Sequence, residues 1–135
     1  MLKLIIGLKG TGKTKTLIQM INASLDTTKG SVVCIEKGKK LTYDVKYQCR
    51  LIDADEYLIS DAQSLYGFVA GILANNHDIT DLYIDTAMQI CGFDEVAFDK
   101  FVDEVATLSD KLGCNCVVSA TIDAEKASET VKKYI

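Results

Sequence analysis

Residues 7–14, Gly7-Leu8-Lys9-Gly10-Thr11-Gly12-Lys13-Thr14, form a glycine-rich loop that decides the fold of this chain. They fit the pattern G-x-x-x-x-G-K-[ST] in full. At average residue usage, a chain of this length would match that pattern by chance about one time in 200. The apolar run 2–6 precedes the loop and a helical pattern over 12–24 follows it. A strand before the loop and a helix after it are the context that the pattern requires.

The residue types of the glycine-rich loop suit an anion. Glycine lets the backbone curl without Cβ clashes, so that backbone N–H groups can point inward. The helix that follows adds the positive end of its dipole. Lys13 supplies a mobile charge for the β- and γ-phosphates of a nucleotide, and the Thr14 hydroxyl can ligate Mg²⁺. We therefore expect nucleotide contacts from Gly7, Leu8, Lys9, Gly10, Thr11, Gly12, Lys13, Thr14 and Lys15.

The rest of the chain alternates between apolar runs and amphipathic stretches. Strands are predicted at 2–6, 31–36, 51–52, 81–85 and 116–118, and helices at 12–24, from a Ser60–Gln63 capping box to Leu73, at 94–112 and at 123–134. Residues 41–49 alternate apolar and polar, which is typical of a half-exposed strand or hairpin arm. This order predicts a three-layer α/β sandwich, with a mainly parallel sheet covered by helices on both faces. No linker interrupts it, so residues 1–135 are predicted to form a single domain.

Composition excludes several classes of protein. The 15 basic and 19 acidic residues give a net charge of −4, so nucleic-acid binding is not indicated. No apolar run approaches the ~20 residues of a membrane span. The five cysteines include no Cys-x-x-Cys pair, and a single histidine leaves a zinc site poorly supplied. Met1 leads straight into a strand, so we expect no signal peptide, a cytoplasmic location and free thiols.

A second acidic site is expected at the end of a neighbouring strand, where a carboxylate would hold Mg²⁺ through water. The apolar run Leu82-Tyr83-Ile84 ends at Asp85, which makes Asp85 the favoured metal residue beside Thr14. Asp53, which follows the shorter run Leu51-Ile52, is the competing assignment. Thr86, and not a glutamate, follows Asp85, and a threonine cannot act as a base at neutral pH.

These motifs resemble those of the P-loop NTPase superfamily, and the order of elements over residues 1–121 resembles a minimal RecA-like ATPase core. The resemblance implies ATP and Mg²⁺ as ligands, and it implies that the second strand neighbours the strand of Asp85. It also implies two further catalytic residues besides Lys13. Glu36, at the end of the second strand, would be the hydrolytic base, and Ser119 would sense the γ-phosphate. GTP is disfavoured because no Asn-Lys-x-Asp motif is present.

Three functions stay open at this point. The first is a small RecA-like ATPase, acting with a protein partner or as a homo-oligomer. The second is a nucleoside or small-molecule kinase, although the only arginine, Arg50, cannot make the arginine-rich lid that such transfer usually needs. The third is a non-hydrolysing regulatory module, which Thr86 favours. Tyr43 and Tyr47 are predicted to pack within the hairpin arm rather than to stack on a base.

Overall fold

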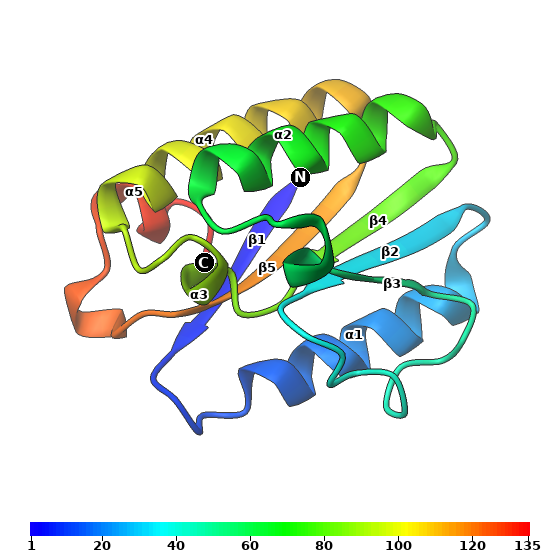
Figure 1. The fold of residues 1–135 in the computed structure, drawn as a ribbon, viewed down its shortest axis with the longest axis horizontal. Helices are drawn as coiled ribbons and strands as arrows, with labels where there is room; N and C mark the ends of the chain where they lie inside the picture. The colour runs from blue at the N-terminus through cyan, green and yellow to red at the C-terminus, as the bar shows by residue number, and fades with distance from the viewer.

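Five short strands form one parallel sheet in the order β1-β5-β4-β2-β3 (Figure 1). The computed structural model describes residues 1–135. The strands are β1 (Leu2–Gly7), β2 (Ser31–Glu36), β3 (Arg50–Asp53), β4 (Ile79–Ile84) and β5 (Asn115–Thr121). The helices are α1 (Lys13–Thr27), α2 (Ala62–Asn75), α3 (Ala87–Ile90), α4 (Glu95–Leu112) and α5 (Glu129–Lys132), with single 3-10 turns at Ala54–Tyr57 and Ala124–Lys126. The predicted parallel α/β fold is confirmed.

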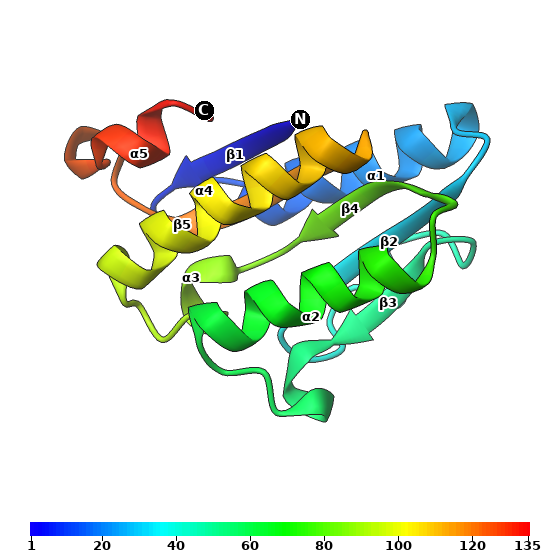
Figure 2. The ribbon, with the colours of Figure 1, turned by 90° about the horizontal axis from the view of Figure 1, so that it is seen from above.

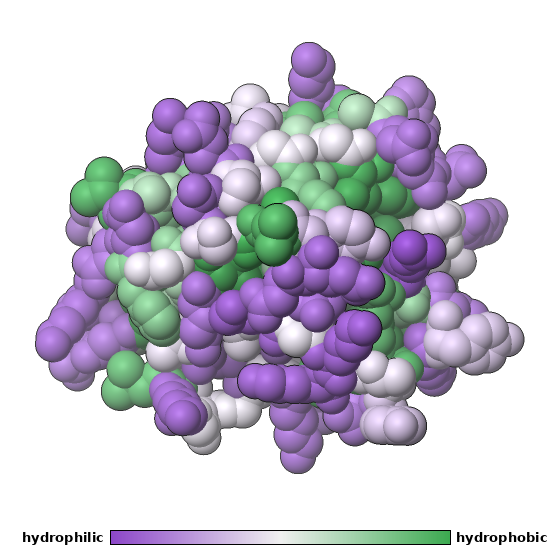
Figure 3. Space-filling model, in the orientation of Figure 1, coloured by the Kyte–Doolittle hydropathy of each residue, from purple (hydrophilic) through white to green (hydrophobic).

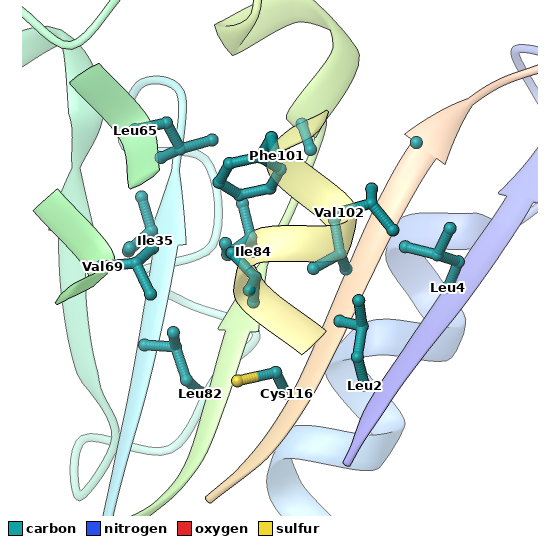
Figure 4. Close-up of a cluster of buried hydrophobic side chains, with 14 of the residues drawn as sticks. Leu2, Leu4, Ile35, Leu65, Val69, Leu82, Ile84, Phe101, Val102 and Cys116 are labelled. Carbon is teal, nitrogen blue, oxygen red and sulfur yellow. The ribbon is translucent and has the colours of Figure 1, made fainter. Parts of the chain in front are cut away.

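Helices cover both faces of the sheet, as the alternating order predicts. Figures 1 and 2 show α1 on one face and α2 and α4 side by side on the other. The larger core lies under α2 and α4. It holds Phe98 and Phe101 together with buried apolar side chains from β1, β2, β4 and β5, and Ile52 of β3 packs against it. Figure 4 shows part of this core around Phe101. The smaller core lies under α1, around Leu17 and Ile21. Alternate residues of each strand supply the two cores, because neighbouring strand residues point to opposite faces.

The long helix α4 follows its sequence signals closely. The Asp94 side chain accepts a hydrogen bond from the Ala97 N–H, and Gly113 ends the helix in the left-handed region at φ 67°. Helix α2 begins one residue later than the predicted capping box. Asp61 and Ser64 cap it reciprocally, so Ser60 and Gln63 are not the capping pair. Aspartate accepts an N–H hydrogen bond at an N-cap at least as well as serine does, and Asp61 rather than Ser60 is the N-cap of α2.

The predicted hairpin arm over 41–49 is wrong, because this segment consists of turns. Leu41, Val45 and Cys49 are buried against α1 in the smaller core, whereas Tyr43 and Tyr47 are 98% and 90% exposed. The segment is also tied to α1 by Asn22, whose side chain donates to the Asp44 carbonyl and accepts from the Lys46 N–H. The tyrosines therefore do not pack, and residues 41–49 act as a cover for the edge of α1.

The C-terminal region also departs from prediction. In place of one helix over 123–134 there is a 3-10 turn and the four-residue α5. The Tyr134 carbonyl accepts a hydrogen bond of 2.7 Å from the Leu4 N–H, so the last residues cover the outer edge of β1. No helix has the length and apolar content needed to cross a membrane. The face in Figure 3 is hydrophilic over most of its area, with hydrophobic side chains between.

Candidate functional site

The parallel topology gathers the predicted site residues at one edge of the sheet. The glycine-rich loop follows β1, Asp85 follows β4, Ser119 lies near the end of β5 and Glu36 ends β2. A cavity of about 230 Å³ opens at this edge, between the loop and the ends of β4 and β5. Its lining has no hydrophobic residue and consists of Lys9, Gly10, Gly12, Lys13, Thr14, Lys15, Thr86, Gln89, Ser119 and Thr121. In parallel α/β sheets ligands bind beyond this edge.

The loop needs its glycines for two different reasons. Gly10 and Gly12 have φ values of 84° and 85°, in the left-handed region that side chains with a Cβ rarely adopt. Gly7 is needed for close approach, since a Cβ there would lie 2.5 Å from the Thr11 hydroxyl oxygen. That hydroxyl donates a 2.7 Å hydrogen bond to the Leu8 carbonyl and closes the turn. The loop is therefore held curled before any ligand arrives.

The start of α1 is left open to an anion. No side chain caps this helix, and its first turn contains no acidic residue. The first N–H groups of a helix have no partner within it, and together with the helix dipole they favour negative charge. The Lys13 ammonium lies at the same end, where its only hydrogen bond is to the Leu8 carbonyl, at 2.9 Å. With Lys9 and Lys15 also in the lining, the cavity is positively charged.

Thr14 and Asp85, which are 71 residues apart, meet beside the cavity, where Thr14 belongs to the lining and Asp85 lies behind it. The Thr14 hydroxyl lies 3.1 and 3.2 Å from the two Asp85 carboxylate oxygens. Ser119 donates to Asp85 Oδ1 at 2.5 Å, and its hydroxyl oxygen accepts the Thr86 N–H at 2.9 Å. Asp85 is only 5% exposed, so its charge is held by these hydroxyl donors rather than by bulk water.

The Thr14 hydroxyl and the Asp85 carboxylate are oxygen donors that fit Mg²⁺ and do not fit zinc. No group of three or more His, Cys, Asp or Glu side chains could enclose a metal ion. Mg²⁺ keeps several waters and is usually bound through one or two carboxylate or hydroxyl oxygens plus substrate phosphates. Thr14 and Asp85 offer that combination beside a cationic cavity. Asp53 does not, because it lies on β3, beyond β2, and its Oδ1 accepts the Gly38 and Asp55 N–H groups at 2.8 and 2.9 Å.

Glu36 is close to Asp85 but outside the cavity lining. Strand β2 pairs with β4, and the Asp85 N–H donates to the Ile35 carbonyl at 2.9 Å. The Glu36 side chain is 4% exposed, and its Oε1 accepts the Lys40 and Leu41 N–H groups at 2.9 and 3.3 Å. Burial raises the pKa of this carboxyl, although those two hydrogen bonds oppose the rise. Glu36 therefore shapes the loop after β2.

Sequence reasoning missed three residues of the lining, Thr86, Gln89 and Thr121. Gln89 lies on α3, a single turn that is too short to show a helical period. Thr121 lies past the predicted end of the last strand, because β5 continues to Thr121, where it pairs with Gly7. Only their position in the sequence could have indicated these residues. Polar residues that follow Asp85 and Ser119 within a few positions are expected at the carboxyl edge of the sheet.

Fold and lining together define a parallel α/β protein with a polar, lysine-lined cavity at the carboxyl edge of its sheet. The chain matches no protein-family model, and no curated protein gives a significant match to it.

Proposed function

We propose that this chain is a Mg²⁺-dependent ATP-binding protein of the P-loop NTPase type, with a RecA-like core and ATPase activity. The contact between the Thr14 hydroxyl and the Asp85 carboxylate carries the proposal. The motif that contains Thr14 calls for a carboxylate from a distant strand to share its metal ion. Asp85, and not Asp53, lies against that hydroxyl.

The order of strands supports the RecA-like assignment. Strand β5 lies between β1, which leads into the glycine-rich loop, and β4, which leads to Asp85. Strand β2 is next to β4, which is the neighbour relation that the resemblance implies for Glu36. Ser119 on β5 consequently sits between the loop and Asp85, in hydrogen-bond contact with the latter.

The loop, Lys13, Thr14, Asp85 and Ser119 would then each contribute to binding. The loop N–H groups and the open start of α1 bind phosphate oxygens, and Lys13 moves from the Leu8 carbonyl to the β- and γ-phosphates. Thr14 and Asp85 would hold Mg²⁺, Thr14 through its hydroxyl oxygen and Asp85 through its carboxylate. Mg²⁺, when bound, neutralises charge that develops between the phosphates. Ser119 keeps the Asp85 carboxylate oriented throughout.

Hydrolysis requires a base for the attacking water, and Glu36 is the proposed one. It is the carboxylate nearest along the sheet to Asp85, on the adjacent strand. Its Oε1 is committed to the Lys40 and Leu41 N–H groups, so only Oε2 is available for a water. Because Glu36 Oε1 is already bonded to the Lys40 and Leu41 N–H groups, a second candidate function is also favoured. This is a nucleotide-dependent switch with slow or no turnover, whose nucleotide-bound state is recognised by another protein.

Binding and turnover are tested separately. Thermal melts with Mg-ATP at a hundredfold excess over the dissociation constant should gain about 2.7 kcal/mol of stability. For a chain of this size that is a rise of the midpoint by about 10 °C. Failure of ATP, ADP and GTP alike to move the midpoint would contradict the proposal. Steady-state phosphate release then separates an ATPase from a switch, and release that appears only with an added nucleoside acceptor would indicate a kinase.

A further inference from the structure

Two of the five free cysteines form a pair at the edge of the sheet opposite the candidate site. Cys114 joins α4 to β5, and Cys116 is the second residue of β5. Alternate residues of an extended segment point to the same face, and both side chains lie in the larger core, in which Figure 4 labels Cys116. The Cys116 thiol donates a hydrogen bond to the Cys114 sulfur. The two thiols are therefore in contact in the reduced protein.

The backbone around this pair allows a disulfide between the two sulfurs. An extended chain rises about 3.3 Å per residue, so Cα atoms two residues apart lie about 6.6 Å from each other. Disulfides join Cα atoms that are roughly 4.4–6.8 Å apart. The Cys116 N–H donates to the Met1 carbonyl at 2.9 Å, and the Cys114 N–H donates to the Ser109 carbonyl at 3.1 Å. Because both backbones are held by neighbouring elements, the pair can close by rotation of its side chains.

A second cavity, of about 270 Å³, opens beside this pair. It lies between the C-terminal ends of α2 and α4, and Cys114 belongs to its lining together with His77 and Lys111. Lys111 is exposed and forms no ion pair with an acidic side chain. A free ammonium at the mouth of a cavity attracts small molecules that carry carboxylates. A small anionic reagent can therefore meet Cys114 from the cavity, although this residue is buried in the core.

The two thiols of the pair differ in acidity from each other and from the other cysteines. The hydrogen bond from Cys116 lowers the pKa of Cys114, although burial opposes this change, and the same hydrogen bond raises the pKa of Cys116. Burial raises the pKa of Cys91 to about 12. Because the thiolate is the nucleophile in thiol chemistry, Cys114 is suited to attack and Cys116 to follow it.

We propose that Cys114 and Cys116 form a redox-active dithiol that low-molecular-weight disulfides oxidise to an intramolecular disulfide. The Cys114 thiolate attacks one sulfur of the small disulfide, whose S–S bond breaks and releases one thiolate. The Cys116 thiol then loses its proton and attacks the Cys114 sulfur, the mixed disulfide breaks, and the second small thiolate leaves. Two electrons pass from the protein to the small disulfide, and the two protons of the dithiol end on the two released thiols. This chemistry does not need nucleotide binding, because the pair lies at the other edge of the sheet.

Oxidised glutathione, a small disulfide that carries carboxylates, is the probe. The reduced proteins are the wild type, Cys114→Ser, Cys116→Ser and, as the matched control, Cys91→Ser, which changes a buried thiol of the same core. Mass spectrometry after an acid quench should find the disulfide between Cys114 and Cys116 in the wild type and in Cys91→Ser. Cys116→Ser should stop at a glutathione adduct on Cys114, and Cys114→Ser should form neither product.

Alkylation of the wild type keeps the test valid even if a serine variant fails to fold. With limiting iodoacetamide, Cys114 should be modified at least about 10-fold faster than Cys91, because a larger fraction of it is thiolate. Equal rates at these two cysteines would overturn the inference. So would a folded wild type that forms no disulfide between Cys114 and Cys116 with oxidised glutathione, or an adduct on a different cysteine in Cys116→Ser.

Discussion

Removal of the Lys13 ammonium should abolish most of the nucleotide affinity and leave the fold intact. The ammonium makes a single hydrogen bond in the ligand-free protein, to the exposed Leu8 carbonyl at 2.9 Å. It forms no ion pair with an acidic side chain. Lys13→Ala should therefore change the free energy of unfolding by no more than about 0.5 kcal/mol, the usual range for a surface substitution.

The loss of affinity follows from the contacts that Lys13 is expected to make. A hydrogen bond to a charged group is worth about 1.5–3 kcal/mol. Contacts to two phosphates then give about 3–6 kcal/mol, which corresponds to binding about 10²- to 10⁴-fold weaker. Calorimetric titration with Mg²⁺ and a non-hydrolysable ATP analogue measures this directly. The control is Lys100→Ala, an exposed lysine of α4. A folded Lys13→Ala protein with undiminished affinity would refute the reasoning.

Further changes test the remaining residues. Asp85→Asn should weaken the Mg²⁺ dependence of binding more than binding itself, and an unaltered Mg²⁺ titration would move the assignment to Asp53. Glu36→Gln should keep near-normal ATP affinity and lose ~10²-fold or more in phosphate release, whereas undiminished turnover would exclude Glu36 as the base. Because burial raises the pKa of Glu36, its contribution to wild-type stability is present below about pH 4.3 and lost as the pH rises through the folded pKa. Thermal midpoints followed across that range should therefore fall less in Glu36→Gln, and parallel curves would contradict the burial argument. Gly30→Ala would place a Cβ 2.3 Å from the Asp78 carbonyl oxygen, so urea melts should show a loss of about 1–3 kcal/mol, and an unchanged midpoint would refute this clash.

Elements with a local signal at both ends could be predicted from the sequence. Helix α4 has a continuous apolar face, an aspartate cap at Asp94 and a glycine stop at Gly113, and it forms within one residue of the predicted bounds. The buried strands β1, β2 and β4 are apolar runs that end at Gly7, at Glu36 and just before Asp85. In each of these cases the local preference and the buried face agree, so no distant contact is needed to choose the structure.

The segment 41–49 shows what local pattern cannot decide. Apolar residues at every second position satisfy a strand, but those that are buried, Leu41, Val45 and Cys49, lie four apart. The tyrosines between them fit either pattern, since their rings are apolar and their hydroxyls are polar. The choice is made by α1, through the smaller core and the two hydrogen bonds of Asn22. A contact of this kind cannot be seen in a window of nine residues.

Some contacts of the candidate site could likewise be predicted from local sequence pattern, and others could not. The proximity of Thr14 and Asp85 could be predicted from the sequence. The glycine-rich loop motif identifies Thr14, and Asp85 follows a parallel strand whose carboxyl end lies at the same edge of the sheet. The hydrogen bonds of Glu36 to the Lys40 and Leu41 N–H groups depend on the shape of a loop without periodicity, so they were not predictable. Gln89 was missed because one helical turn gives no pattern to detect.

A structure of the chain with Mg²⁺ and a non-hydrolysable ATP analogue tests the central claim most directly. The N–H groups of residues 7–14 should surround the phosphates, with Mg²⁺ bound to the Thr14 hydroxyl oxygen. Asp85 should reach the ion through its water shell. A nucleotide bound elsewhere on the chain, or a metal ion held by Asp53 with Thr14 still bonded to Asp85, would contradict it.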